Sequence, residues 1–305
     1  MSLALLFPGQ GTQHPEMLRW VDDDPAAAAT LARLAHDIGS GWRAHLADAD
    51  WACSHAVAQS LLTGLSLAAW DCLAPRLPAP AVVAGYSVGE LPAFCAAGVF
   101  DTATALQLAR ARAGAMAQAM SGLDGGLLAV QGPSAAALAQ ACTEHGLDLA
   151  IRLGPDRAVL GGPDASLRAA QSALQAAGAQ CTRLAVQVAS HTHWMADAAL
   201  AFARQLGSLP FAPPRATLVC NLGATTPRSP AALKHALAGQ IATTVPWDAC
   251  QDAIAERRVR CVLEVGPGST LSRLWNEREP AVPARSIDEF RSADAAARWV
   301  HGVLG

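Results

Sequence analysis

Lysine and tyrosine are nearly absent from this 305-residue chain, which has one of each, Lys234 and Tyr86. Lys234 lies in a polar segment that we expect to form an exposed helix, so a catalytic serine–lysine pair has few candidates. Charged residues make up 15% of the chain, the formal net charge is −3, and the basic residues form no run. We therefore expect no nucleic acid as a partner.

Long apolar runs are also missing. The run from Leu3 to Phe7 stops at Pro8, which is too short for a signal peptide, and no other stretch is long and clean enough to span a bilayer. We therefore expect a cytoplasmic protein without a membrane partner. Hydrophobic residues nevertheless make up 52% of the sequence, enough for a sizeable core in one large domain or in one domain with an insert.

The cysteines form no Cys-x-x-Cys pair, so the sequence indicates neither a zinc site nor a redox motif. We interpret them as buried free thiols of a reducing cytosol. His191 and His193 resemble a metal-binding fragment, but residues i and i+2 do not share a helix face, and we expect no metal. The cysteines are Cys53, Cys72, Cys95, Cys142, Cys181, Cys220, Cys250 and Cys261.

Alternating strand and helix patterns predict an α/β fold. We expect a hydrolase-like large domain with a mainly parallel sheet, formed by residues 1–122 and 188–305. Residues 123–187 read β-α-β-β-α-β, which predicts a small ferredoxin-like subdomain inserted into the large domain. A helix near 191–206 brings the chain back, and terminal helices follow the last strand. The expected strands are 3–7, 81–86, 127–131, 148–153, 157–161, 180–186, 217–221 and 259–265.

The most informative motif is Gly85-Tyr86-Ser87-Val88-Gly89, which follows an apolar run and precedes a helix-compatible segment. A sharp strand-to-helix turn exposes its central serine above the positive end of a helix, and the two glycines avoid collisions in that turn. Ser87 is therefore a candidate nucleophile for attack on a carbonyl. Tyr86 either shapes the pocket or packs under the turn.

A serine nucleophile needs a base, and His191 is the best candidate. It lies where the chain leaves the small subdomain, and a base at such a junction can face a cleft. The ordinary interpretation of a single histidine is a surface or hydrogen-bonded core residue.

Phe7-Pro8-Gly9-Gln10-Gly11-Thr12-Gln13 is the second unusual segment. A strand that ends in a glycine-rich turn exposes backbone N–H groups at the carboxyl edge of a sheet. The spacing of its glycines matches neither the dinucleotide-binding fingerprint nor a P-loop. The simpler interpretation is that this loop supplies a second backbone N–H donor to an oxyanion.

Taken together, these motifs resemble the malonyl-CoA:acyl-carrier-protein transacylase family along nearly the whole chain. Tyr86, where histidine is commoner in the family, and the Gly89–Ala93 run resemble the malonyltransferase (epsilon) subunit of malonate decarboxylase. The matching pieces, in family order, are 7–13, 85–90, 97–101, an arginine-bearing helix, 190–191 and 264–268.

The resemblance implies a role for each catalytic residue. Ser87 is the nucleophile and His191 the general base, which is oriented by the backbone carbonyl of Gln240. The backbone N–H groups of Gln10 and Val88 form the oxyanion hole.

The resemblance also implies that Arg112 grips the free carboxylate of the malonyl group, a role that suits a planar bidentate donor. Without the resemblance, we would interpret Arg112 as an exposed arginine on a helix, which is how we interpret Arg110. The chain departs from the family at 153–157, where Pro155 is kept but the family's Asn and Gln are lost. We hypothesise that Arg157 meets phosphates of the CoA donor or of the carrier arm.

The expected function is transfer of a malonyl group from malonyl-CoA to the thiol of an acyl carrier protein through a malonyl-serine intermediate, for malonate decarboxylase, with no bound cofactor. The carrier would bear a phosphopantetheine-type or phosphoribosyl-dephospho-CoA arm, and other malonate decarboxylase subunits are further possible partners. Three alternatives stay open: the transacylase of fatty-acid or polyketide synthesis, a serine (thio)esterase, and a non-catalytic carrier-docking subunit. The esterase lacks a convincing acid in the order Ser…Asp…His, because Asp148, Asp156 and Asp164 fall in the small subdomain.

Overall fold

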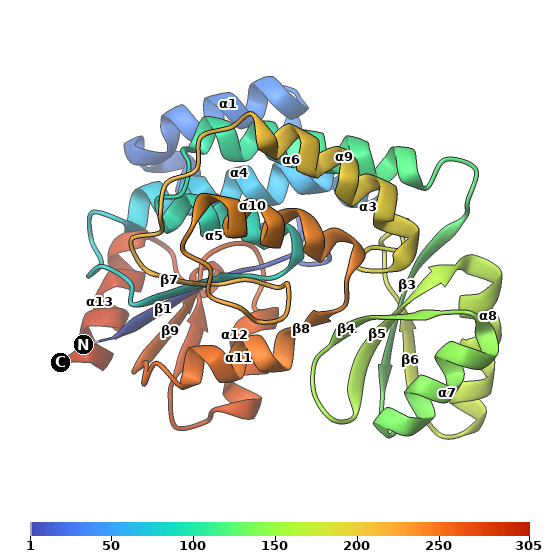
Figure 1. The fold of residues 1–305 in the computed structure, drawn as a ribbon. Helices are drawn as coiled ribbons and strands as arrows, with labels where there is room; N and C mark the ends of the chain where they lie inside the picture. Colours follow the sequence, from blue (N-terminus) through green and yellow to red (C-terminus); the bar gives the residue numbers. More distant parts are fainter. Residues whose placement is uncertain (1) are drawn as a thin grey trace.

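One of the two five-stranded sheets is parallel throughout, with the strand order β10-β9-β1-β2-β7 (Figure 1). The structure, a computed structural model, describes residues 2–305. Apolar residues fill β1, β2 and β9 almost without interruption, as expected for parallel strands covered on both faces. The strands are β1 (Leu3–Phe7), β2 (Val82–Gly85), β7 (Thr217–Val219), β9 (Cys261–Glu264) and β10 (Ala284–Ser286).

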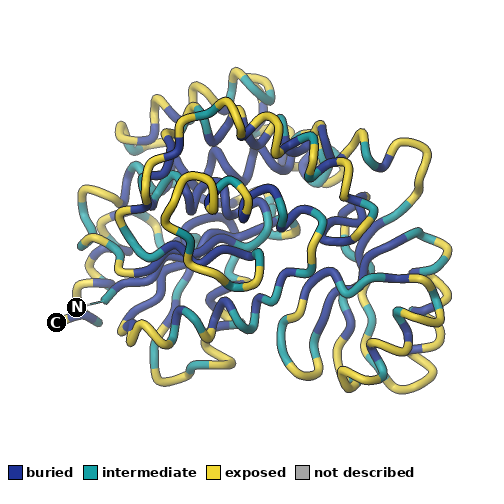
Figure 2. The backbone as a smooth tube through the Cα atoms, in the orientation of Figure 1, coloured by how far each residue is buried: buried dark blue, intermediate teal, exposed yellow. Residues whose placement is uncertain are grey.

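Helices cover both faces of this sheet, and the buried residues concentrate in the sheet and in the helices next to it (Figures 1 and 2). The central helix α4 (His55–Leu73) is long and apolar enough to cross a membrane by length and composition, but 78% of that window is buried inside the protein. It is therefore a core helix that is apolar on most sides. Further helices are α1 (Ala28–Ile38), α5 (Glu90–Ala96), α6 (Thr102–Ala119), α9 (Ala196–Gly207), α10 (Pro230–Gly239), α11 (Trp247–Ala255), α12 (Thr270–Arg278) and α13 (Ala293–Leu304).

The second sheet has the order β6-β3-β5-β4-β8, and its first four strands pair antiparallel. With two helices packed over a separate apolar cluster, these four strands form the ferredoxin-like unit, which lies at the side of the parallel sheet (Figure 1). The predicted fold class is confirmed, while the exact domain boundaries stay a prediction. The elements are β3 (Gly125–Gln131), α7 (Ala135–His145), β4 (Asp148–Arg152), β5 (Arg157–Pro163), α8 (Asp164–Ala176) and β6 (Gln180–Arg183).

The sequence did not predict two short strands, β8 and β10. β8 (Val245–Pro246) comes from the chain after the ferredoxin-like unit and pairs parallel with β4. It therefore connects the ferredoxin-like unit to the rest of the protein. β10 adds an edge strand after β9, where we expected only helices. These two strands, of two and three residues, carry too little alternation to be recognised from sequence.

The helix expected from about His191 begins later. A 3-10 turn (His193–Met195) leads into α9, which starts at Ala196. His191 has a φ of +65°, which no residue of a right-handed helix adopts. His191 therefore lies in an irregular segment before the helix.

Candidate active site

Ser87 lies at the tip of a tight turn between β2 and α5, with a φ of +56°. The turn leaves no room for side chains on either side. A Cβ at Gly85 would lie 2.0 Å from the carbonyl oxygen of Gly89, and a Cβ at Gly89 would lie 2.1 Å from the carbonyl oxygen of Phe7. Both glycines are thus required, and the serine is held in a conformation that L-residues rarely adopt.

His191 is brought to Ser87 across 104 positions of sequence. Its Nε2 lies 2.8 Å from Ser87 Oγ, and its Nδ1 lies 2.6 Å from the carbonyl oxygen of Gln240. A carbonyl can only accept, so Nδ1 carries the proton and Nε2 is free to accept the proton of Ser87. The backbone N–H of His191 also donates to the carbonyl of Ile241, at 2.8 Å, which fixes the backbone beneath the ring.

The environment of His191 favours its neutral form. Burial and, to a lesser extent, the positive charge of Arg112 lower its pKa to about 3, although the hydrogen bond to Gln240 opposes both effects. An imidazole that is neutral at pH 7 can act as a base toward a hydroxyl.

Arg112, on α6, is 1% exposed and points at the serine. Its Nη2 donates to Ser87 Oγ at 3.3 Å, and its Nη1 donates to Gln59 Oε1 at 2.8 Å. Burial lowers its pKa to about 10, against the nearby charge of Glu90, so the guanidinium keeps its charge at neutral pH. Both contacts are to neutral groups, and Nε has no partner within residues 2–305. Arg110, by contrast, is half exposed and pairs with Asp37.

Gln59, on α4, is a site residue that the sequence analysis missed. It is fully buried, and its Oε1 accepts from Arg112 while its Nε2 donates to His55 Nε2 at 3.1 Å. Gln59 therefore fixes the plane of the guanidinium. Its signal in the sequence was a glutamine inside an otherwise apolar helix.

Asn221 was also missed, and it holds the turn that carries Ser87. Its Oδ1 accepts the backbone N–H of Ser87 at 2.7 Å, and its Nδ2 donates to the carbonyl of Gly85 at 2.6 Å. Its own backbone N–H donates to Glu90 Oε1 at 2.7 Å. Burial raises the pKa of Glu90 to about 8, while the Asn221 N–H and the charge of Arg112 oppose the shift. The N–H of Ser87 is thus occupied, which leaves the next amide, that of Val88, as the one this turn can offer to an oxyanion.

The glycine-rich loop after β1 lies directly on this turn. A Cβ at Gly9 would lie 2.8 Å from the carbonyl oxygen of Tyr86 and 3.6 Å from Ser87 Cβ. This close approach brings the segment of Gln10 next to Ser87. The assignment of Gln10 and Val88 as oxyanion donors stays a prediction.

The ring of Tyr86 packs edge-to-face against Trp247, with 5.1 Å between ring centroids, and it lies beneath Gly9. Burial raises the pKa of its hydroxyl above the usual value. These contacts favour the interpretation of Tyr86 as a residue packed under the turn.

The remaining candidates lie elsewhere. His193 hydrogen-bonds to Asp148 Oδ2 at 2.8 Å, so it does not join His191 at the serine. Arg157 pairs with Glu277 at 2.7 Å, and Lys234 donates to the carbonyl of Gly207. No group of three metal-ligating side chains occurs in the described part of the chain, where every cysteine is a free thiol.

Comparison with known proteins places these motifs in one family. Residues 4–293 match the model of the acyl transferase domain. The chain is 32% identical over 302 residues to the malonyl CoA-acyl carrier protein transacylase of Mycobacterium tuberculosis, covering 97% of this chain and 99% of that protein. It is 30% identical over 308 residues to the Escherichia coli K12 protein of the same name, covering 96% and 98%.

Solved structures give the same result. An acyl-carrier-protein S-malonyltransferase from Burkholderia pseudomallei matches with a TM-score of 0.89 at 28% identity, covering 98% of this chain and all of that one. A malonyl-transacylase solved in complex with a type II polyketide synthase acyl-carrier protein matches with a TM-score of 0.91 at 28% identity, covering 98% and 99%.

Proposed function

The chain belongs to the acyl transferase domain family, and within it to the malonyl-CoA–acyl carrier protein transacylases, and from this premise we propose a role for Ser87. Ser87 carries a malonyl group between two thiols. Malonyl-CoA is the donor, and the thiol of an acyl carrier protein is the acceptor. The observation that carries the proposal is the line of contacts from Arg112 through Ser87 and His191 to the carbonyl of Gln240.

The first half-reaction uses this line directly. Ser87 Oγ attacks the thioester carbonyl while its proton passes to His191 Nε2, and the carbonyl oxygen becomes an oxyanion that the N–H groups of Gln10 and Val88 stabilise. The tetrahedral intermediate collapses, the C–S bond breaks, and the leaving CoA sulfur takes the proton from His191. The product is a malonyl ester on Ser87.

The second half-reaction runs the same steps in reverse. The carrier thiol gives its proton to His191 and its sulfur attacks the ester carbonyl. The C–O bond to Ser87 then breaks, and Ser87 Oγ recovers the proton. Throughout, the carbonyl of Gln240 keeps the proton on His191 Nδ1, so that Nε2 alone exchanges protons.

Arg112 explains why the acyl group would be malonyl. A buried guanidinium 3.3 Å from the nucleophile, with only neutral groups in contact, is suited to a carboxylate that lies close to the reacting carbonyl. A malonyl group places its carboxylate one methylene from that carbonyl. The same carboxylate would offset the charge of Arg112 that disfavours protonation of His191.

A serine esterase is less well supported, because a backbone carbonyl takes the place that an acid would have at His191 Nδ1. Asp148 pairs with His193, Asp164 pairs with Arg183, and the partner of His191 is a backbone carbonyl. A non-catalytic docking subunit is also less well supported, because the nucleophile, base and cation are in contact.

For the carrier, we propose that of malonate decarboxylase, with a phosphoribosyl-dephospho-CoA arm and with other decarboxylase subunits as partners. Tyr86 and the Gly89–Ala93 run support this choice. A phosphopantetheine carrier of fatty-acid or polyketide synthesis is the second candidate, which the names of the relatives favour.

The test loads the enzyme with malonyl-CoA, removes free donor, and adds one carrier at a time, with Ser87→Ala and a thiol-blocked carrier as controls. Discharge at least tenfold faster to the phosphoribosyl-dephospho-CoA carrier supports the decarboxylase assignment. Faster discharge to the phosphopantetheine carrier replaces that assignment with the second candidate. Discharge to water at the rate seen with a carrier would contradict transfer altogether.

A further inference from the structure

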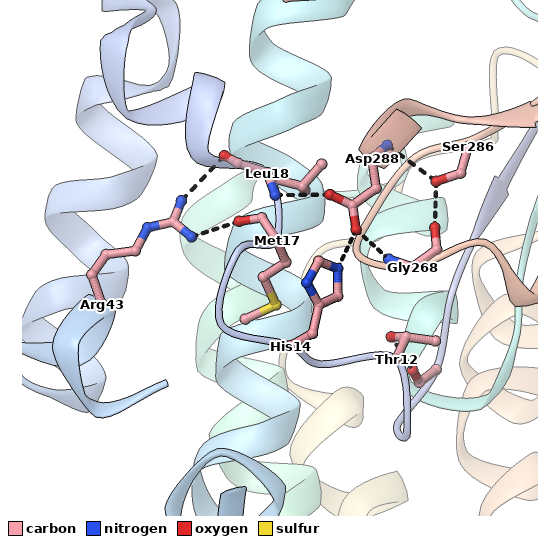
Figure 3. A network of polar contacts seen from close by, with 9 residues as sticks. Thr12, His14, Met17, Leu18, Arg43, Gly268, Ser286 and Asp288 are labelled. Carbon is pink, nitrogen blue, oxygen red and sulfur yellow. Dashed lines mark hydrogen bonds and ion pairs between the residues drawn. The ribbon is translucent and has the colours of Figure 1, made fainter. Parts of the chain in front are cut away.

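A carboxylate far from the serine in sequence holds the glycine-rich loop in place. Asp288 follows β10, and its side chain is 10% exposed. Its Oδ1 accepts the backbone N–H of Leu18 at 2.9 Å, and its Oδ2 accepts the backbone N–H of Gly268 at 2.7 Å (Figure 3). Oδ2 also lies 2.5 Å from His14 Nε2, which donates to it. One carboxylate therefore joins three separate points of backbone and side chain.

Two of these points lie on the segment 8–18, which carries Gln10. This segment connects β1 to the 3-10 turn Arg19–Asp23 and contains neither helix nor strand. Fixing such a segment costs conformational entropy, which specific contacts must offset. Asp288 supplies such contacts at His14 and Leu18.

The third point, Gly268, belongs to the Gly266-Pro267-Gly268 turn, which packs on the same loop. A Cβ at Gly266 would lie 2.5 Å from Pro8 Cδ, and a Cβ at Gly268 would lie 3.1 Å from Thr12 Cβ. Thr12 Oγ1 in turn donates to the carbonyl of Gly9 at 3.0 Å. The glycines of this motif thus allow the turn to lie against the loop, and Asp288 fixes the turn.

The anchor itself is well fixed. A capping box holds the residues around Asp288: its backbone N–H donates to Ser286 Oγ at 3.1 Å, and Glu289 accepts the N–H of Ser286. At the other side of the loop, Arg43 Nη1 donates to the carbonyl of Met17 at 2.7 Å (Figure 3). Leu18 has a φ of +49°, an unfavourable conformation that these contacts from both sides maintain.

We propose that Asp288 is a positioning residue for the oxyanion donor at Gln10, acting through His14, Leu18 and the Gly268 turn. This inference rests on the proposed function, because it assumes that the Gln10 N–H stabilises the oxyanion. Both half-reactions pass through that oxyanion, so loss of the anchor slows both. Binding of malonyl-CoA through Arg112 does not depend on the loop and is kept.

The experiment is single-turnover formation of the malonyl ester, followed by intact-protein mass in rapid-quench samples. Loss of one oxyanion donor slows acyl transfer about 10²- to 10³-fold, so a displaced donor in Asp288→Ala should slow ester formation by about 10- to 100-fold. The dissociation constant of malonyl-CoA, measured in the Ser87→Ala background, should change less than twofold. Discharge of the ester to a carrier should slow by the same factor as its formation.

Asp24→Ala is the matched control. Asp24 also accepts a backbone N–H, that of Ala26 at 3.0 Å, and lies near a cation, Arg76, at 3.4 Å, but it caps a turn before α1. It should lose comparable stability and keep its ester-formation rate within twofold. Equal rates for Asp288→Ala and Asp24→Ala, or a loss confined to malonyl-CoA binding, would overturn the inference.

A second pair of variants covers the case in which Asp288→Ala does not fold. His14→Ala removes one contact and should slow ester formation severalfold, while His14→Gln keeps an N–H donor and should recover most of the rate. Equal rates in both would also overturn the inference. Failure of the wild-type protein to form the ester would instead contradict the proposed function.

Discussion

Replacing Arg112 separates recognition of the malonyl carboxylate from the chemistry at Ser87. Arg112→Met keeps an unbranched side chain of similar length and removes the charge. Acetyl-CoA has the same reacting carbonyl as malonyl-CoA but no carboxylate. Comparing the two donors therefore isolates what the guanidinium contributes.

The size of the effect follows from the burial of Arg112. Lowering its pKa from 12.5 to about 10 corresponds to roughly 3 kcal/mol for holding the charge in the interior. A malonyl carboxylate offsets this cost, and breaking a buried ion pair of this kind costs about 3–5 kcal/mol. At about 1.4 kcal/mol per factor of ten, Arg112→Met should lose roughly 10²- to 10³-fold in kcat/KM for malonyl-CoA.

The assay measures kcat/KM for acyl-serine formation with both donors in wild type, Arg112→Met and Arg112→Lys. Acetyl transfer should stay within about tenfold of wild type in Arg112→Met, because that donor makes no ion pair. Arg112→Lys should fall between the two, since it keeps the charge but cannot donate from two nitrogens in a plane. Equal losses with malonyl-CoA and acetyl-CoA would refute the reasoning and make Arg112 a structural residue.

Three further predictions concern the groups around the serine. Asn221→Ala leaves the Ser87 N–H without its acceptor, at a cost of about 1–3 kcal/mol, and should slow ester formation about 10- to 100-fold. An unchanged rate by rapid quench would show that the Ser87 turn keeps its conformation without Asn221. Because burial lowers the pKa of His191 to about 3, kcat/KM should be flat as pH falls from about 8 to about 6, and a midpoint near 6.5 would contradict that burial. Since burial raises the pKa of Glu90 from 4.5 to about 8, the folded protein holds a proton that the unfolded chain has lost, and stability falls by about 1.4 kcal/mol per pH unit through that window. The Tm of Glu90→Gln relative to wild type should therefore rise between about pH 5 and pH 8, and a constant difference would show that Glu90 is ionised throughout.

The fold and the tight turn at Ser87 were predictable because both depend on local patterns. The apolar run before Gly85 reads as a buried strand, and the glycines around Ser87 permit only a tight turn. The order of elements in 123–187 identified the small unit in the same way. In each case neighbouring residues carry the whole signal.

The surroundings of the serine could not be predicted from local patterns, because they depend on contacts between distant segments. The resemblance to the family alone brought Gln240 and Arg112 to the site of Ser87 and His191. Arg112 lies on an alanine-rich helix with no distinct apolar face, so nothing in its neighbourhood indicates burial. Gln59 and Asn221 acquire roles only once α4 and β7 meet the turn of Ser87. The φ of +65° at His191 could not be predicted from the sequence either, because a histidine does not indicate a left-handed conformation as a glycine does.

The most direct test of the whole account is the intact mass of the protein after brief mixing with malonyl-CoA, compared with Ser87→Ala. We expect one malonyl adduct on the wild type and none on the variant. The adduct should be lost rapidly when a carrier thiol is added and slowly in water. Rapid release of free malonate without a carrier, or no adduct on the wild type, would contradict this expectation.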